Sequence, residues 1–272
     1  MGNWLKINPL RKYLTVFKIS WQNSLVYRLN FIMWRIRNIL SLTAIYFLWS
    51  AVFKTKQIFG WQLSSVLTYI LLSSVLRSVV FSSRTVDLAW RINRGEINNF
   101  LLKPLSIFKY AFSIDLADKL LNLLFCLGEI WLLIFLFRPP LILKTNFIYF
   151  LIFCSTIFFS IILYFFVNFL IGTIGFWTPE VWAPRFLFQI VLGFAAGSYF
   201  PLDFLPRPIY LFLKLTPFSY FIFFPSQIYL KRISLGQIIQ GFLILIIWTF
   251  ILFRLTKLTW QKGIKHYEAQ GI

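Results

Sequence analysis

The residues able to do chemistry are few in this sequence, and most of them stand alone. The chain of 272 residues has 8 Asp and Glu against 27 Lys and Arg, and its one histidine is His266. No paired carboxylates, Ser/His/Asp set or metal-ligand spacing occurs in the sequence. We therefore predict no catalytic residue, no metal site and no enzyme activity in this chain, and we expect His266 to be solvated.

Carboxylates within apolar sequence are the exceptions. Glu129 has no basic residue one helical turn away, and an ionised carboxylate there is costly unless it faces a cavity, a partner or water. It is a candidate contact on a translocation pathway, and a protonated structural carboxyl is the alternative. Asp115 is a second candidate contact on that pathway. It stands four residues before Lys119, which favours mutual neutralisation over a cation site. Asp203 is predicted to cap a short helix.

The elements that must position these side chains are membrane helices. Hydrophobic residues make up 59% of the chain and aromatic residues 21%, whereas soluble domains average about 45–50% apolar residues. The net charge of +19 is spread between apolar runs, while a nucleic-acid site would gather it on one polar domain. The sequence therefore predicts an all-α integral membrane protein that binds membrane lipid and no nucleic acid.

Six spans are predicted, because a crossing of the hydrocarbon layer needs roughly 20 apolar residues. They cover about residues 31–53, 61–83, 111–137, 147–176, 185–200 and 238–255. Together they form one transmembrane domain, 31–272. Arg35 and Arg37 lie near the start of the first span and are expected to reach back to the interface.

Two segments flank or interrupt this pattern. Residues 1–30 carry apolar residues at helical spacing among basic ones, which predicts an amphipathic interfacial helix, with a basic leader as the equal alternative. Residues 201–230 contain Pro201, Pro206 and Pro217 in apolar sequence. That is too broken for one span and too apolar for a solvent loop, so we predict short re-entrant helices.

Six spans place both ends of the chain on one side of the membrane. Most Lys and Arg fall in the N-terminal segment, in the loop between the second and third spans and in the C-terminal segment. By the positive-inside rule these parts are cytoplasmic, in a multi-pass protein of the cell membrane.

The loop at residues 84–106 gathers charge, Gly and Pro in mid-chain, most densely in RGEINNFLLKPLS, Arg94 to Ser106. A short helix with exposed apolar residues and a turn at Gly95 is typical of a knob that enters a partner's cleft. An amphipathic connector that rests on lipid explains the same pattern equally well.

The string Arg94-Gly95-Glu96, Phe100-Leu101-Leu102, Pro104-Leu105-Ser106 resembles the cytoplasmic loop of ABC-2-type permeases. Gly197, Phe200-Pro201-Leu202, Leu205-Pro206 and Thr216-Pro217-Phe218 resemble the re-entrant outer segment of that family. With six spans, the likeness covers nearly the whole chain and is closest to a compact bacterial branch of the family.

The resemblance implies that the loop couples the chain to a separate ATPase subunit, and that transport occurs between two permease chains, identical or homologous. The coupling contacts would be Arg94, Gly95, Glu96, Leu101, Leu102 and Pro104. The sequence contains no G-x-x-x-x-G-K-[ST] motif, so ATP and Mg would be bound by the partner, with no cofactor in this chain.

The function predicted is that of a permease subunit of an ATP-binding-cassette exporter for an unidentified, hydrophobic substrate. One alternative is an importer's coupling subunit, which would carry two long cytoplasmic helices with an Ala-Arg-small signature, not found here. The other is a membrane scaffold or assembly protein that transports nothing.

Overall fold

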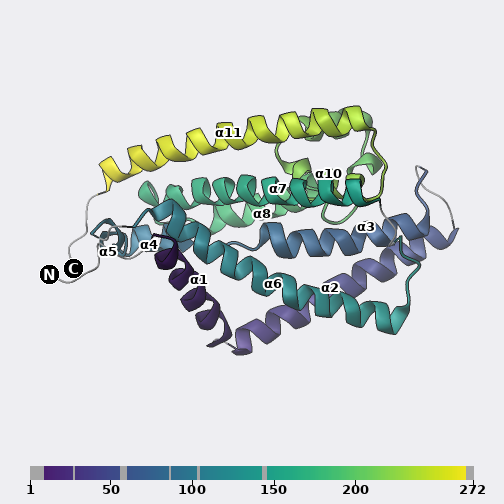
Figure 1. Ribbon diagram of the computed structural model, residues 1–272, viewed down its shortest axis with the longest axis horizontal. Coiled ribbons are helices and arrows are strands. Elements are labelled where there is room, and N and C mark those ends of the chain that lie inside the picture. Colours follow the sequence, from purple (N-terminus) through teal and green to yellow (C-terminus); the bar gives the residue numbers. More distant parts are fainter. Residues whose placement is uncertain are drawn as a thin grey trace.

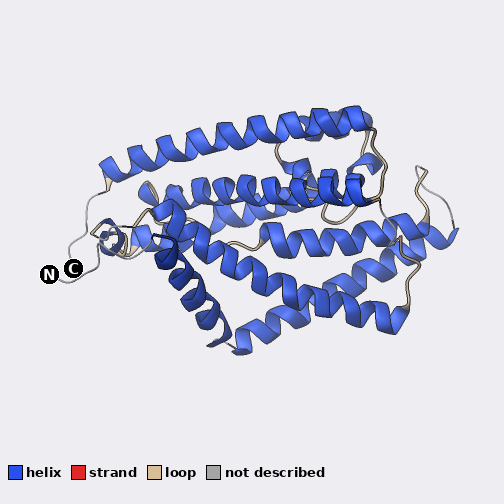
Figure 2. Ribbon diagram, viewed as in Figure 1, coloured by secondary structure: helices blue, strands red, loops and turns tan. Residues whose placement is uncertain are grey.

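The computed structural model describes residues 9–26, 28–55, 60–85, 87–102, 105–142 and 146–267. Within these ranges every regular element is helical, and no strand is drawn (Figure 2). The predicted all-α membrane class is confirmed.

Five helices are long and apolar enough to cross a membrane. They lie roughly along one direction in Figure 1. They are α2 (Arg28–Thr55), α3 (Leu63–Leu76) continued by the π-helical turn η2 (Arg77–Phe81), α6 (Ile107–Phe137), α7 (Phe147–Thr173) continued by the 3-10 turn η3 (Ile174–Phe176), and α11 (Leu235–His266). Their apolar segments match five of the predicted spans, and the last is longer than predicted.

The fifth predicted span differs from the structure. It corresponds to α8 (Trp182–Ala195), of 14 residues, which rises only about 21 Å against a hydrocarbon layer of about 30 Å. Pro184 lies in its first turn, where proline is tolerated. The helix is therefore too short to cross the layer by itself.

The proline-rich segment folds as short helical pieces. They are η4 (Leu202–Phe204), α9 (Arg207–Leu215), η5 (Phe218–Tyr220) and α10 (Phe223–Tyr229). Pro201, Pro206 and Pro217 each occupy the N-cap position of one piece, where the missing N–H costs nothing. The chain bends by 80° between 207–215 and 218–229, and α10 is buried. Whether this segment enters the membrane from outside stays a prediction.

Helix α3 holds the turn that follows α8. Tyr69 Oη donates to the Gly197 carbonyl (2.5 Å), and Ser73 Oγ donates to the Ser198 carbonyl (2.8 Å). Trp61 Nε1 donates to the Asp203 carboxylate (3.0 Å). Asp203 was predicted to cap the next helix. That prediction was wrong, because the N-cap residue of α9 is Pro206, and no side-chain hydrogen bond caps this helix.

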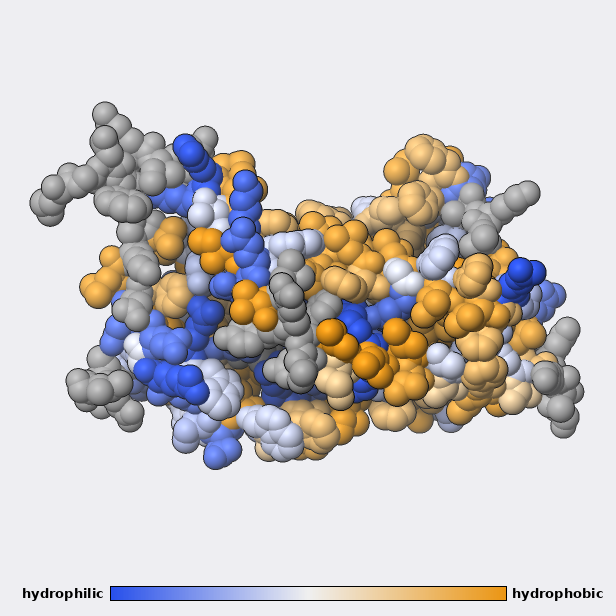
Figure 3. Space-filling model, turned by 90° about the horizontal axis from the view of Figure 1, so that it is seen from below, coloured by the Kyte–Doolittle hydropathy of each residue, from blue (hydrophilic) through white to orange (hydrophobic). Residues whose placement is uncertain are grey.

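Two terminal elements meet the loop between α3 and α6 at one end of the bundle (Figure 1). Helix α1 (Pro9–Val26) packs on α6, and Tyr13 Oη accepts a hydrogen bond from the Ser106 amide (3.2 Å). The end of α11 packs on η3, where the rings of Trp260 and Phe176 are 5.4 Å apart. Hydrophilic side chains gather at this end, beside an apolar middle band (Figure 3).

Candidate functional site

The loop predicted to contact a partner forms two short helices joined by a turn. Helix α4 spans Asp87–Asn93 and α5 spans Asn98–Leu101. Gly95 lies between them with φ +74°, a left-handed conformation that glycine adopts without steric cost. The Gly95 amide donates to the Ile92 carbonyl (3.1 Å), and the Gly95 carbonyl accepts from Asn98 (3.2 Å). The predicted turn at Gly95 is confirmed.

The helix pair has one buried face and one exposed face. The buried face consists of four residues that are at most 5% exposed: Leu88, Ala89, Ile92 and Ile97. Leu88, Ile92 and Ile97 pack with side chains of α6 and α7, and Ala89 lies against Gly175. On the other face the exposed fractions are 56% for Trp90, 51% for Leu101 and 85% for Leu102. Exposed apolar side chains on so short an element are unusual unless a partner or lipid covers them.

The predicted contacts Arg94 and Glu96 are also exposed. The Arg94 guanidinium lies 4.9 Å from the Trp90 ring, so charge and apolar surface adjoin. Pro104, the remaining predicted contact, lies outside the described residues. The structure therefore brings Arg94, Glu96, Leu101 and Leu102 onto the exposed part of one small element.

Two glycines at the end of the fourth span let α4 approach closely. A Cβ placed on Gly175 would lie 2.8 Å from the Ala89 backbone, and one on Gly172 would lie 3.1 Å from Leu88 and the Thr85 carbonyl. Side chains at either position would push α4 away. The sequence analysis did not single out these residues, because their effect depends on which segment packs against them.

Asp115 fastens the beginning of the loop to α6. Its buried carboxylate accepts hydrogen bonds from Ser83 Oγ (2.7 Å) and from the amides of Arg84 (2.8 Å) and Thr85 (3.0 Å). Such bonds to a charged acceptor are about twice as strong as neutral ones. These hydrogen bonds give Asp115 a structural role. They do not support its predicted role on a translocation pathway.

Lys119, one turn further along α6, holds the end of the second span. Its buried ammonium group donates to the carbonyls of Val80 (2.8 Å) and Ser82 (2.5 Å), where η2 leaves carbonyls without helical partners. The Asp115 carboxylate therefore accepts hydrogen bonds from the segment that connects η2 to α4, and the Lys119 ammonium group donates hydrogen bonds to carbonyls of the same segment. We call this attachment of residues 80–85 to α6 by five hydrogen bonds the connector clamp.

A chain of polar side chains continues the clamp into the membrane band. Arg84 pairs with Asp118 (3.3 Å), and Asn122 donates to the Asp118 carboxylate (3.1 Å). Arg35 on α2 donates to the Asn122 amide oxygen and pairs with Glu129 (3.2 Å). α2, α6 and the connector are thereby joined by hydrogen bonds.

This chain corrects one expectation and refines another. The Arg35 side chain is 9% exposed and turns inward, so the prediction that it reaches back to the interface was wrong. It supplies the basic partner that Glu129 lacks on its own helix, because helix spacing cannot reveal a partner on another span. A role for Glu129 on a translocation pathway stays a prediction.

Arg91 stabilises the loop from within. Arg91 donates to Tyr110 Oη (3.4 Å) and lies 5.3 Å from the Phe100 ring, which ties α4 and α5 to α6. Burial raises the pKa of the Asp87 carboxyl, and the nearby cations Arg185, Arg84 and Arg91 oppose that shift. Helix α4 thus begins with a carboxylate surrounded by positive charge.

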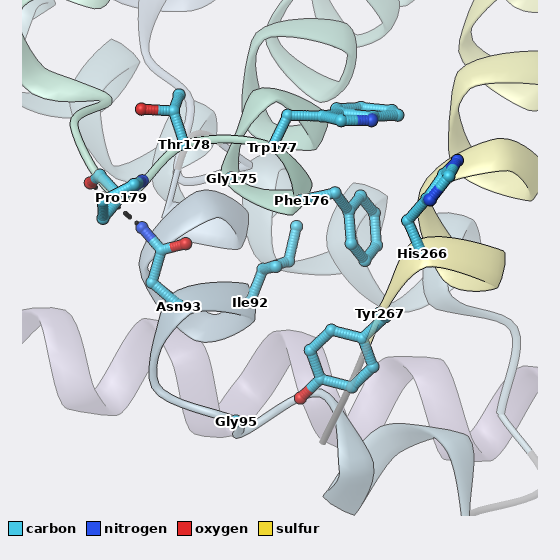
Figure 4. A pocket seen from close by; sticks show the side chains of 10 residues that line it. All are labelled: Ile92, Asn93, Gly95, Gly175, Phe176, Trp177, Thr178, Pro179, His266 and Tyr267. Atoms are coloured by element: carbon cyan, nitrogen blue, oxygen red, sulfur yellow. Dashed lines mark hydrogen bonds between the residues drawn. The ribbon is translucent and has the colours of Figure 1, made fainter. Parts of the chain in front are cut away.

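A cavity of about 350 Å³ opens beside the Gly95 turn (Figure 4). It lies between α4, the segment after α7 and the end of α11. Its lining residues are Ile92, Asn93, Gly95, Gly175, Phe176, Trp177, Thr178, Pro179, His266 and Tyr267. Asn93 Nδ2 donates to the Pro179 carbonyl (3.1 Å) across one wall. His266 is exposed on another side, as expected.

The residues that line this cavity include no paired acid and base. Their aromatic rings and backbone groups suit binding better than catalysis. In the part of the chain that the structure describes, no three His, Cys, Asp or Glu side chains gather where a metal could bind. The site is therefore an exposed, clamped helix pair with a cavity at its side.

Comparison with known proteins agrees with this arrangement. The family model described as ABC-2 family transporter protein matches residues 39–271, which include the loop, the clamp, four of the five long apolar segments and most of the first. No curated protein matches the chain. Since the family model covers most of the sequence, the chain belongs to the ABC-2 family of membrane transporter proteins.

Proposed function

We propose that the chain is the permease subunit of an ATP-binding-cassette exporter in the cell membrane. A separate ATPase subunit binds ATP and Mg and docks on the helix pair α4–α5. A second permease chain, identical or homologous, completes the pathway, and the substrate has hydrophobic character. Family membership supports the transporter class, while partner, direction and substrate are the proposal.

The observation that carries the docking site is the exposure of Leu101 and Leu102 on a helix pair whose other face is buried. Apolar anchors on a short helix are a common way to enter a partner's groove. The flanking Arg94 and Glu96 offer charged contacts at the rim, where charge contributes more to specificity than to affinity.

The second support is mechanical. A docking element transmits force only if it is fixed to the spans it moves. Here α4 packs at Gly175 on η3, which continues α7. The connector that follows α3 and η2 is clamped to α6. A displacement of the helix pair would therefore move three spans together.

The orientation proposed follows from charge. Helices α4 and α5, the start of α1 and the end of α11 lie at the same end of the bundle (Figure 1). Basic residues are most frequent in these segments, so the positive-inside rule makes this end cytoplasmic. An ATPase in the cytoplasm would meet it directly.

The test is co-purification of the tagged full chain from native membranes in mild detergent, followed by mass spectrometry of the bound proteins. We expect a Walker-motif ATPase, and a second permease if the pathway is heterodimeric. Recovery of this chain alone, also after crosslinking, would contradict the proposal and favour the scaffold.

A matched pair of variants locates the contact. Leu102→Asp places a charge on the proposed docking surface, and Leu235→Asp places one on an exposed leucine at the start of α11, at the opposite end. We expect only the first to lose the ATPase. Equal retention by both variants would rule out α4–α5 as the docking element.

A further inference from the structure

Helices α7 and α11 pack along each other and leave an open groove of about 450 Å³ between them. The proposed docking role uses none of the residues that line it. One face of each helix supplies the walls, and Ser155 is the only polar side chain among them. Its short side chain deepens the groove. The lining residues are Leu151, Ile152, Ser155, Ile238, Ile239, Phe242, Leu243 and Ile246.

The groove reaches as deep as one membrane leaflet. Ile246, the last lining residue on α11, is eleven residues after Leu235, where the helix begins. At 1.5 Å per residue this distance is about 16 Å, which is half of a hydrocarbon layer about 30 Å thick. The start of α11 lies at the end of the bundle away from α4–α5 (Figure 1). The groove therefore opens to the leaflet on that side.

The size of the groove favours a hydrocarbon chain over a helix of another protein. A helix with its side chains is about 10–12 Å across, so a length of 16 Å fills roughly 1,300–1,800 Å³. That volume is about three to four times that of the groove, and a helix could contact only the rim. An extended acyl chain has no branches and can lie along the exposed walls, where Leu151, Ile239 and Leu243 are 52%, 63% and 56% exposed.

Positive charge lies at the membrane-surface end of the groove. Lys231 is exposed, and its ammonium nitrogen is 5.6 Å from the centre of the Tyr149 ring, two residues before Leu151 on α7. No carboxylate pairs with Lys231 in the part of the chain that the structure describes. Helix α11 begins at Leu235, so the positive end of its dipole points the same way. An anion held here would lie directly above the apolar walls.

We propose that the α7–α11 groove binds one acyl chain of an anionic phospholipid, whose phosphate lies at Lys231 and the first turn of α11. The ammonium group attracts the phosphate, and the free amides of the first helical turn can donate hydrogen bonds to it. The apolar walls add many weak packing contacts along the chain. Binding of this lipid needs neither an ATPase nor transport, so this proposal and the proposed function can fail separately.

The test is native mass spectrometry of the full chain in detergent, titrated with phosphatidylglycerol. Ser155→Phe fills the groove, and Cys154→Phe places the same ring on an exposed neighbour that does not line it. We expect the Ser155 variant to bind about tenfold more weakly, because roughly ten atom contacts with the acyl chain are lost. The Cys154 variant should bind as the unchanged chain does, and equal binding by both variants would overturn the proposal.

A second filling variant guards against misfolding. Ile239→Trp narrows the groove from the α11 wall, where the side chain is exposed. We expect it to weaken binding as Ser155→Phe does, with a melting temperature close to that of the unchanged chain. Undiminished binding in this variant would contradict the groove as the site of the acyl chain.

Lys231 and Arg138 form a matched pair for the headgroup. Both are exposed at this end of the bundle, with φ of +54° and +43°, a conformation that asparagine tolerates. Lys231→Asn should weaken binding of phosphatidylglycerol about fivefold and reduce its advantage over phosphatidylcholine of the same acyl chains. Arg138→Asn should change neither. An equal loss in both variants would overturn Lys231 as the headgroup contact.

Two other occupants would give different results. A second copy of the chain in the groove would make Ser155→Phe convert a dimer into a monomer in the same spectra, without loss of lipid. A site for a soluble anion would let millimolar glycerol phosphate displace the bound phosphatidylglycerol. We expect neither result, and either one would contradict a lipid site.

Discussion

Substitution of Gly175 by alanine is the sharpest test of how the docking element is held. The new Cβ would lie 2.8 Å from the Ala89 Cα and carbonyl oxygen, while ordinary contact begins at 3.4 Å. These are backbone atoms, so rotation of a side chain cannot relieve the clash. Helix α4 must retreat by roughly 0.6 Å or open more often.

The expected magnitude follows from the cost of overpacking, typically 1–3 kcal/mol. If that cost falls on α4, the free energy of opening this helix drops by the same amount. Its protected amides then exchange about 5- to 150-fold faster. The spans themselves should be little affected, because the clash involves a helix of seven residues at their end.

The assay is hydrogen–deuterium exchange mass spectrometry on peptides covering residues 87–95. Gly128→Ala is the matched control, since a Cβ at this position in α6 meets nothing within 4 Å. We expect faster exchange in the Gly175 variant and unchanged exchange in the control. Equal exchange in both variants would refute the close approach of α4 to the end of α7.

The remaining predictions concern the clamp, the turn and the ion pair. Asp115→Asn should speed exchange of the Arg84 amide about fivefold, because a neutral acceptor bonds about 1 kcal/mol more weakly than a carboxylate; an unchanged rate would contradict the clamp. Gly95→Val should impose about 1–2 kcal/mol of left-handed strain and weaken ATPase co-purification, with insertion intact; full retention of the ATPase would show that the turn is not needed. Glu129→Leu should lower the melting temperature in detergent by leaving Arg35 without its carboxylate partner, a loss of about 3–5 kcal/mol. Adding Arg35→Met should recover most of it, and additive losses would mean that the two side chains are not coupled.

Local sequence patterns predicted the spans because hydropathy is a local property. Four of the five long helices have apolar segments whose bounds agree with the prediction within a few residues, and only α11 extends well beyond it. The turn at Gly95 was predictable for the same reason, since a glycine between two short amphipathic stretches favours a left-handed residue.

Contacts between distant segments were not predictable in this way. Arg35 and Glu129 are 94 residues apart, so the partner of either depends on which spans pack together. The same holds for Asp115, whose spacing to Lys119 indicated a pair. The structure instead has both side chains binding the backbone of the connector.

Short elements also escaped the sequence patterns. The predicted span at residues 185–200 became the 14-residue helix α8, because the apolar sequence continues past Ala195 into a turn held by Tyr69 and Ser73. Hydropathy does not register that change. The helix itself ends in a local turn at Gly197, which has φ +76°: the Gly197 amide donates to the Phe194 carbonyl (3.0 Å), and the Ser198 amide donates to the Gly193 carbonyl (3.0 Å).

The central claim, that α4–α5 docks on an ATPase, is tested most directly by photocrosslinking in cells. A photoreactive amino acid at Leu102 is compared with the same amino acid at Leu235, both on exposed positions at opposite ends of the bundle. We predict that position 102 captures a Walker-motif ATPase and that position 235 does not. Capture of lipid alone at 102, or of the ATPase equally at both positions, would contradict the claim.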